Sequence, residues 1–483
     1  MVVPQSQAST AVVIGSGLAG LLAARVLADF FSAVTIVERD PLPTTVGPRK
    51  GVPQGHHAHA LLGRGQEILE EFFPGLTQHL LSLGAAQGHG RFFSGGGYHY
   101  PIAFGSHSLR VSRPCLETVA RAYLLRTAKV HSVENCRVLG LTATEDRQRI
   151  TGIRFTRHQA DAQEEHLAAA FVIDASGRGS RASAWLEDLG YPQPETELVK
   201  VDMGYTSRFY RRLPYHLDGD VVANIAASPA NKRACGMMAQ EGERWIVTLA
   251  GYFGDYPPTD EQGFVEFSRS LPVSDVHDVI RTTTPLSDPV AYRFPSNQWR
   301  HYEKLTRFPD GFLPIGDAIC SFTPIYGQGI TVAALEALTL RQCLMAETNN
   351  LAQRFFTKTK RVIDTPWSIT VGNDKRLAGG QAVPSLKSRF LHWYMAQLHV
   401  VARHDPSVSL AFRKVANLYT APTSLLHPRI VRRVLWGSLR SERMRKTTSP
   451  SAVYSQSTPG LWDTAALLQQ RRAIEGRETK RRE

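Results

Sequence analysis

Three glycines near the amino terminus have the spacing that phosphate binding requires. They lie in residues 15–20, GSGLAG, which form a G-x-G-x-x-G. In such a turn Gly15 allows the tight bend, and Gly17 lets the backbone approach a pyrophosphate. Gly20 lets a helix pack closely on a strand. The chemistry indicated is the binding of a dinucleotide.

The elements around this turn match the unit that positions it. Apolar residues predict a strand over 11–14, a helix over 18–30 and a second strand over 33–37 that ends in Glu38. The N–H groups of Leu18 and Ala19 would lie at the positive end of the helix dipole. Glu38 can accept hydrogen bonds from a ribose diol. The adjacent Arg39 is a further candidate for binding the dinucleotide. The pattern leaves open whether the dinucleotide is NAD or FAD.

Two later segments repeat the pattern of an apolar strand that ends in glycine with an acid or a small residue. The first, FVIDASGRGSR, spans 171–181 and places Asp174 after the strand. The second spans 312–337 and carries Gly316-Asp317 directly after the apolar run FLPI. It continues into a glycine-rich turn, residues 324–329, and a predicted helix over 330–345.

The order and spacing of these segments resemble those of flavoprotein monooxygenases that use one Rossmann domain for FAD, the para-hydroxybenzoate hydroxylase and squalene epoxidase type. The resemblance covers residues 1–190 and 300–345. It implies that Asp317 hydrogen-bonds the ribityl chain of FAD, and that Asp174 supports the pyrophosphate region and the reductant's approach. It also implies that Glu38 binds the adenosine ribose and that Arg113 lies near the cofactor.

The turn before the predicted helix at 330 would face the flavin ring. Gly327, Gly329 and Ile330 bring bare N–H groups and a positive dipole end to this position. Because reduced flavin carries negative charge at its N1–C2=O edge, such a site favours the reduced form. Pro324 and Tyr326 lie in the same turn and are candidate catalytic residues on the substrate side of the ring.

A histidine-rich loop, residues 49–59, follows the Glu38 strand. In the resembling family this position lies by the flavin. His57 and His59 are therefore candidates to donate to flavin or substrate oxygens, or to move protons near neutral pH. No third metal ligand is evident nearby, so we predict no metal site. Polar histidines in a structural loop are the alternative.

The fold class follows from the order of these patterns. We expect an α/β protein, α+β overall, with a Rossmann-type FAD-binding domain, an inserted mixed β-sheet substrate domain and a C-terminal helical region. Strand-like segments over 199–252 and a helix over 259–270 build the inserted domain, and irregular chain follows to about 310. The expected bounds are 1–195 with 300–345 for FAD binding, 196–299 for the substrate domain, 346–440 for the helices and 441–483 for a basic, flexible tail.

The C-terminal third combines large apolar residues with a basic cluster between 429 and 446. One interpretation is an interfacial helix that rests on an anionic membrane and admits a lipophilic substrate. The other is a helical cap over the substrate domain. Since no recognition motif accompanies the charge, we expect no nucleic-acid partner.

The composition is that of a globular protein, because 42% of the 483 residues are hydrophobic and 20% are charged. The N-terminus lacks the basic and apolar regions of a signal peptide, and no apolar run reaches the roughly 18 residues of a membrane span. The five cysteines are scattered, which fits a reducing compartment. We expect a cytoplasmic protein, with peripheral membrane contact through the basic C-terminal helices as the alternative.

No second G-x-G-x-x-G is visible, which suits an enzyme that NAD(P)H visits as a transient reductant. It equally suits an oxidase or dehydrogenase that never uses NAD(P)H, or an enzyme served by a partner reductase. The W-x-W-x-I-P segment of flavin halogenases and the Y-x-W-x-F-P motif of prenyl reductases are absent. The resemblance implies an FAD-dependent monooxygenase, a hydroxylase or epoxidase, that uses O2 on a lipophilic or aromatic secondary metabolite. An oxidase, dehydrogenase or redox-neutral cyclase is the alternative. A non-catalytic flavin-binding or membrane-associated partner protein is the second.

Overall fold

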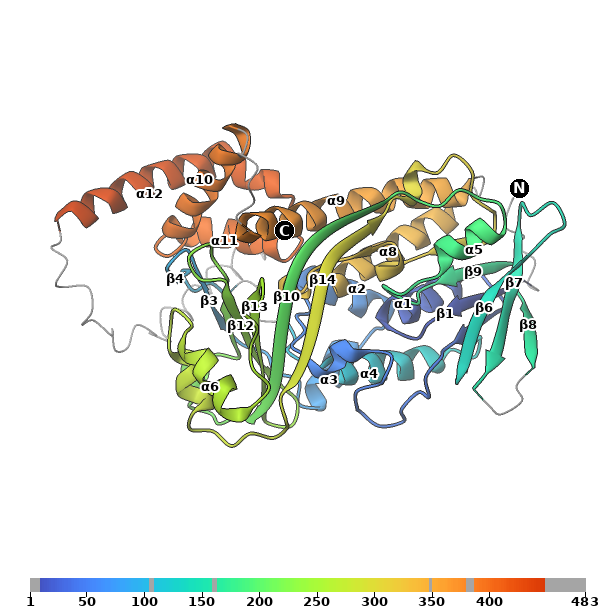
Figure 1. Ribbon diagram of the computed structural model, residues 1–483, viewed down its shortest axis with the longest axis horizontal. Coiled ribbons are helices and arrows are strands. Elements are labelled where there is room, and N and C mark those ends of the chain that lie inside the picture. Colours follow the sequence, from blue (N-terminus) through green and yellow to red (C-terminus); the bar gives the residue numbers. More distant parts are fainter. Residues whose placement is uncertain (1–8, 104–107, 159–162, 347–349, 379–385, 448–483) are drawn as a thin grey trace, which may run out of the picture. The chain divides into compact units, whose positions relative to one another are not determined.

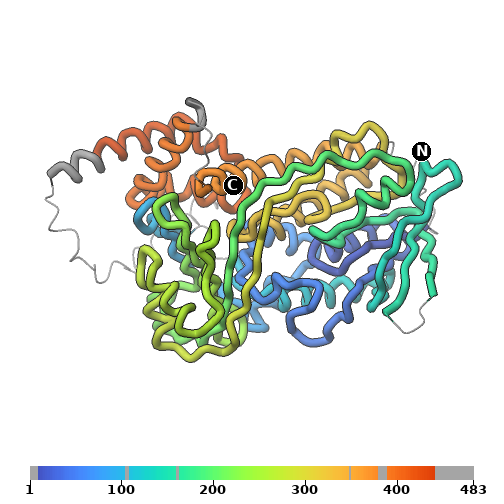
Figure 2. The backbone as a smooth tube through the Cα atoms, in the orientation of Figure 1, coloured from blue at the N-terminus to red at the C-terminus, as the bar shows by residue number. Residues whose placement is uncertain are grey.

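The computed structural model describes residues 9–103, 108–158, 163–346, 350–378 and 386–447. The chain divides into two compact units, Met1–Val434 and Leu435–Glu483. The first unit contains the sheets and the helices up to the start of α12 (Pro428–Thr447), and Figures 1 and 2 follow its path. Most of the predicted tail at 441–483 lies outside the described residues.

A five-stranded parallel sheet runs in the order β15-β9-β1-β2-β5. Its register aligns Ile14 with both Val37 and Asp174, and Asp174 with Pro314. Four strands therefore end at one edge, which is where doubly wound sheets bind ligands. The strands are β1 (Thr10–Ile14), β2 (Ala33–Val37), β5 (Val130–Val133), β9 (Phe171–Asp174) and β15 (Phe312–Pro314).

Helices lie beside this sheet, and two of them, α1 and α8, confirm the helices predicted over 18–30 and 330–345. Helix α1 packs against α4 and α8, and α2 packs against α8. Pro114 lies in the first turn of α4, and the Ser112 side chain caps this helix by accepting from the N–H of Cys115 at 3.2 Å. The bounds are α1 (Leu18–Leu27), α2 (Gly63–Phe72), α3 (Leu76–Ser82), α4 (Arg113–Leu125), α5 (Ala182–Asp188) and α8 (Gly329–Met345).

A second sheet has eight strands in the order β16-β14-β10-β13-β12-β11-β3-β4. The pairing is antiparallel except between β11 and β3. Its strands are β3 (Gly90–Ser94), β4 (Gly97–Tyr98), β10 (Thr196–Arg211), β11 (Val222–Ile225), β12 (Arg233–Gln240), β13 (Arg244–Tyr252), β14 (Val290–Arg300) and β16 (Cys320–Ser321). Helices α6 (Glu261–Arg269) and α7 (Asp275–Ile280) pack together beside it.

Part of this sheet differs from the sequence expectation. The expected irregular chain before 310 is wrong, because it holds α7 and the eleven-residue strand β14. Pro295 and polar residues interrupt the apolar alternation of β14, yet its backbone pairs with β10 and β16. The sheet also takes in residues 90–98 and 320–321, which lie outside the expected 196–299.

A small antiparallel sheet, β6-β7-β8, lies beside the parallel one (Figure 1). Its strands are β6 (Cys136–Ala143), β7 (Ile150–Arg157) and β8 (Glu164–Ala168). The turn at 146–148 joins β6 to β7, where Asp146 accepts from the Thr144 hydroxyl at 2.6 Å and from the Gln148 N–H at 3.0 Å.

The C-terminal part of the first unit is helical, as predicted. Tyr394, Leu398, Val408 and Leu425 form part of a separate apolar core among these helices. The bounds are α9 (Leu351–Ala378), α10 (Leu386–Val401) and α11 (Pro406–Ala416). No helix in the described part of the chain is both long and apolar enough to cross a bilayer.

Candidate active site

The glycine turn at the end of β1 is shaped for close approach. Gly15 has φ +100°, and a Cβ there would lie 2.7 Å from the carbonyl oxygen of Ala175. A Cβ on Gly20 would lie 1.9 Å from the carbonyl oxygen of Gly15. At Gly17 the nearest atom to an added Cβ is a guanidinium nitrogen of Arg113, 4.0 Å away. Two glycines therefore close the turn, while the third leaves open space above it.

The start of α1 keeps its backbone donors free of side-chain caps. Gly17 occupies the N-cap position, and the first turn carries no acid. The Leu18 side chain is buried, so Leu18 can contribute only its N–H to a ligand, and Ala19 lies against Gly316. Uncapped N–H groups beside open space suit an anionic phosphate.

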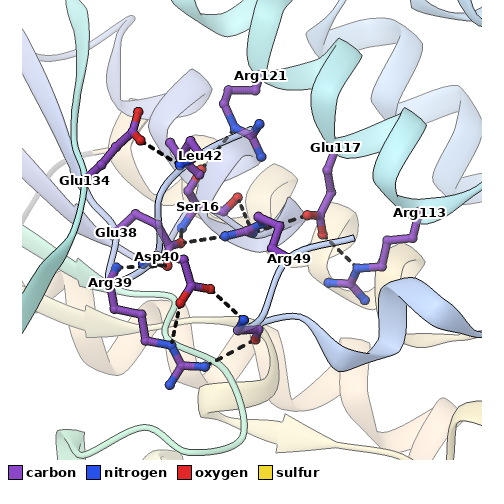
Figure 3. A network of polar contacts seen from close by, with 11 residues as sticks. Ser16, Glu38, Arg39, Asp40, Leu42, Arg49, Arg113, Glu117, Arg121 and Glu134 are labelled. Carbon is purple, nitrogen blue, oxygen red and sulfur yellow. Dashed lines mark hydrogen bonds and ion pairs between the residues drawn. The ribbon is translucent and has the colours of Figure 1, made fainter. Parts of the chain in front are cut away.

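A network of charged residues surrounds this turn (Figure 3). Glu38 accepts from the N–H of Ser16 at 2.7 Å and pairs with Arg49 at 3.1 Å. Arg49 also pairs with Glu117 at 3.2 Å, and Arg113 pairs with Glu117 at 2.7 Å. Glu38, Arg49 and Glu117 are all buried. The network therefore holds Glu38, the residue predicted to bind the ribose, in a fixed position beside the turn.

Sequence reasoning assigned no role to Glu117 or Arg121 and placed Arg49 only in the histidine loop. A signal was present, because Arg113, Glu117 and Arg121 recur every four residues and share one face of α4. The Arg39 side chain is exposed and donates to the carbonyl of Gly51, and its role in binding the cofactor stays a prediction. Its backbone N–H donates to Glu38 at 2.9 Å.

Asp174 at the end of β9 is fully buried. Its carboxylate accepts from the Ser176 N–H at 2.9 Å and the Ser180 hydroxyl at 2.5 Å. Burial raises the pKa of Asp174, and these hydrogen bonds oppose the rise. Asp174 therefore holds the loop that follows β9, and a direct contact with a ligand is excluded by its burial. Arg178 in this loop donates to Ser321 at 3.0 Å.

Gly316 and Asp317 lie in the 3-10 turn η4 (Gly316–Ala318) after β15. Gly316 has φ +66° and donates its N–H to the buried Glu336 at 2.6 Å. Asp317 receives no hydrogen bond from any described residue, and burial raises the pKa of its carboxyl. The charges of Arg113 and Arg178 act in the opposite direction. A carboxylate that receives no hydrogen bond from the described residues fits a hydroxylated ligand such as a ribityl chain.

The predicted flavin-facing turn is η5 (Pro324–Tyr326) followed by the start of α8. Gly327 has φ +64°, and its added Cβ would lie 2.6 Å from the Cβ of Ala60. Gly329 has open space around it, and no side chain caps α8. The Ile330 side chain is buried in the main core, so only its backbone can face a ligand.

Asp374 on α9 anchors this turn. Its carboxylate accepts from the Tyr326 hydroxyl at 3.2 Å, the Thr323 hydroxyl at 2.7 Å and the Asn297 amide at 2.8 Å. Burial raises the pKa of Asp374, and its hydrogen bonds oppose the rise. These partners are far apart in sequence, so no local pattern identified them.

A cavity of about 640 Å³ begins at this turn. Its walls come from the histidine loop, from β3, β11, β12 and β13 of the large sheet, and from helices α9, α10 and α11. His57, His59, Pro324 and Tyr326, the four predicted catalytic residues, all line it. The structure thus separates the predicted residues into a group at the glycine turn and a group at the cavity.

The two histidines are held within the protein. His57 Nδ1 lies 2.8 Å from the Ser207 hydroxyl, and His59 Nδ1 lies 2.9 Å from the carbonyl of His57. Burial lowers the pKa of both rings to about 3, with the charge of Arg113 adding to the effect at His59. Both imidazoles are therefore neutral at physiological pH, with one donor and one acceptor nitrogen each. Because His59 Nδ1 donates to a carbonyl, its Nε2 is left as an acceptor. The described residues contain no cluster of His, Cys, Asp or Glu that could hold a metal.

The fold and the turn define a flavoprotein with a single dinucleotide-binding sheet. The family described as "FAD binding domain" matches residues 8–359, and the chain belongs to this family. The predicted fold class, family resemblance and FAD cofactor are thereby confirmed. FAD fits the uncapped start of α1, the open space over Gly17 and the free carboxylate of Asp317.

Relatives extend the likeness over most of the chain. Protein Rv3254 of Mycobacterium tuberculosis (strain ATCC 25618 / H37Rv) is 35% identical over 350 residues, which are 70% of this chain and 73% of that protein. A flavoprotein/dehydrogenase from Cytophaga hutchinsonii matches with a TM-score of 0.63 and 18% identity, over 90% of this chain and 99% of its own. The flavin-dependent brominase Bmp2 matches with a TM-score of 0.62 and 13% identity, over 91% and 99%. These structures share the fold.

Proposed function

We propose that this flavoprotein is a monooxygenase, a hydroxylase or epoxidase, that uses O2 and NAD(P)H on a lipophilic or aromatic secondary metabolite. The observation that carries the proposal is the cavity of about 640 Å³ that opens from the turn at 324–328. The turn and the start of α8 offer the site for a flavin ring, and the cavity offers space for a substrate beside it. Its walls are mainly apolar, with methionine, leucine, valine and aromatic side chains.

FAD, when bound, supplies the reduced flavin that activates O2. The protein residues then have three tasks. The start of α8 stabilises negative charge on the reduced ring. The apolar walls exclude water from the reacting groups. Neutral His57, held by Ser207 and packed edge-on against Tyr205 at 4.6 Å between ring centroids, orients a polar group of the substrate.

Tyr326 and Asp374 support the turn that presents the ring. Asp374 binds the Tyr326 and Thr323 side chains, which flank Pro324, and so fixes the position of the turn at the cavity. We expect Tyr326 to act by position and by contact with substrate, since the buried environment raises its pKa well above the ordinary value and keeps the hydroxyl protonated.

The likeness to a brominase raises halogenation as a rival reaction. Flavin halogenases carry a lysine early in the chain, and the candidate position here is Lys50. Lys50 is exposed, and no described residue that lines the cavity is a lysine. Together with the absent W-x-W-x-I-P segment, this favours oxygen transfer over halogenation.

The C-terminal helices favour the helical-cap interpretation over the membrane interpretation. Residues of α10 and α11, among them Met395, His399, Phe412 and Arg413, line the cavity. Helices that close a cavity fill the role expected of a cap. A cytoplasmic location, with peripheral membrane contact as the alternative, stays a prediction.

The proposal is tested by NADPH and NADH oxidation by the FAD-loaded protein against a panel of lipophilic and aromatic metabolites. We expect oxidation to accelerate with a subset of compounds and to yield a product heavier by one oxygen atom. Reductant oxidation that yields only hydrogen peroxide with every compound would favour an oxidase. A yellow protein that no electron donor reduces would favour the non-catalytic alternative.

A further inference from the structure

The charges around the cavity are all of one sign. Its described lining residues include four arginines but no aspartate or glutamate, and burial lowers the pKa of the lining histidines His57, His59 and His399, so these rings add no charge at neutral pH. The remaining lining is polar without charge or apolar. Such a wall would attract an anion into an otherwise apolar space.

Most of these arginines lack an acidic partner. Arg91 is bound by acids, including Asp220 at 2.9 Å and Asp275. In contrast, no described acid forms an ion pair with Arg110, Arg376 or Arg413. The guanidinium of Arg110 donates to the carbonyl of its neighbour Leu109, and that of Arg413 donates to the carbonyl of Gly90. The Nε atoms of Arg110, Arg376 and Arg413 are buried without a hydrogen-bond partner.

Arg110 and Arg413 are close enough for their charges to interact, although 303 positions separate them in sequence. Burial lowers the pKa of Arg110 to about 10, and the charge of Arg413 adds to the effect. Burial also lowers the pKa of Arg413, and Asp220 acts in the opposite direction. Asp220, however, is already bound to Arg91. Two buried cations that repel one another are stabilised when an anion binds between them.

The surroundings of the two arginines specify the rest of the ligand. Phe92, Leu62, Val415 and other apolar side chains line the same cavity. Building on the proposed monooxygenase function, we propose that the substrate is an anionic amphiphile. Arg110 and Arg413 bind its carboxylate or another oxyanion, and its apolar body lies toward the turn at 324–328. This anchor would hold the oxidised carbon in one place relative to the flavin ring.

The test measures binding to the FAD-loaded enzyme without turnover. The probes are 2-naphthoate and its uncharged analogue 2-naphthamide, titrated by calorimetry and by the change in flavin absorbance. We expect 2-naphthoate to bind at least tenfold more tightly than 2-naphthamide. Arg413→Gln and Arg110→Gln should each weaken naphthoate binding about ten- to a hundredfold, as expected for losing a hydrogen bond to a charged group. Naphthamide binding should change less than threefold.

Two controls separate charge from folding. Arg413→Lys should keep most of the preference for naphthoate because it retains the charge. Lys414→Gln, on the adjacent exposed residue of α11, should have no effect. Equal binding of naphthoate and naphthamide to the wild-type enzyme would overturn the proposal, and this comparison needs no variant.

A final comparison identifies the source of the anion. If Arg413→Gln raises the KM for NADPH but not for NADH, and leaves naphthoate binding unchanged, the arginines serve the 2′-phosphate of the reductant and the substrate proposal is wrong. If the wild-type enzyme prefers naphthoate through these arginines but oxygenates no compound, the anion site stands and the monooxygenase function fails. The two proposals are thus distinguishable.

Discussion

Replacing Gly17 with alanine should weaken FAD binding while leaving the fold intact. Gly17 has φ −77°, which alanine adopts without strain, and the added Cβ would meet no atom closer than 4.0 Å. We therefore expect the unfolding free energy of the apoprotein to change by less than about 1 kcal/mol. The methyl group would occupy the space through which a pyrophosphate approaches the backbone. Losing one charge-assisted hydrogen bond costs about 1.5–3 kcal/mol, so FAD affinity should fall about ten- to a hundredfold.

Two further glycines provide the controls. Gly20→Ala would place a Cβ 1.9 Å from a backbone oxygen, so it should destabilise the apoprotein by at least about 1–3 kcal/mol. Gly47→Ala meets no atom within 4 Å and should change neither property. The assays are FAD titration of apoprotein by fluorescence quenching and unfolding in denaturant. If the Gly17→Ala apoprotein folds normally and binds FAD like the wild type, the pyrophosphate does not lie over Gly17.

Three other substitutions test the acids around the cofactor. Asp317→Asn should lower FAD affinity about tenfold in the same titration. It should also stabilise the apoprotein at neutral pH, because burial raises the pKa of Asp317 and ionisation therefore costs folding energy as pH rises. Unchanged FAD affinity would contradict the ribityl role. Burial raises the pKa of Glu336 to about 8, so between pH 5 and 8 the native state keeps a proton that the unfolded chain loses. Apoprotein stability should therefore fall with pH by about 1.4 kcal/mol per unit from this group. Glu336→Gln should remove that slope in denaturant titrations, and an unchanged slope would show that Glu336 is ionised. Glu38→Ala should reduce FAD retention on gel filtration, whereas Arg49 keeps its pairing with Glu117. Full retention would exclude Glu38 as the ribose ligand.

The sequence predicted best what is local. The glycine turn and Glu38 lie within 30 residues, so spacing alone indicated the unit and its ligand class. The segments at Asp174 and Gly316-Asp317 followed because each is a strand that ends in a small set of polar residues. In these cases neighbouring residues both form the element and supply the chemistry.

Nonlocal contacts could not be read in the same way. Arg49 pairs with Glu117, which lies 68 positions away, and Asp374 accepts from Asn297, which lies 77 positions away. Strand β14 depends on β10 for its hydrogen bonds, so its own sequence carried little apolar alternation. The assignment of Asp174 to the cofactor region stays a prediction, and its burial and its hydrogen bond from Ser176 make it a support for the loop after β9.

Oxygen transfer is the central claim, and isotope labelling tests it most directly. A single turnover of the NADPH-reduced enzyme, mixed with ¹⁸O2 and a substrate that accelerates NADPH oxidation, should give a product that carries one ¹⁸O atom. An oxidised product without ¹⁸O, accompanied by labelled hydrogen peroxide, would contradict the monooxygenase function and indicate an oxidase.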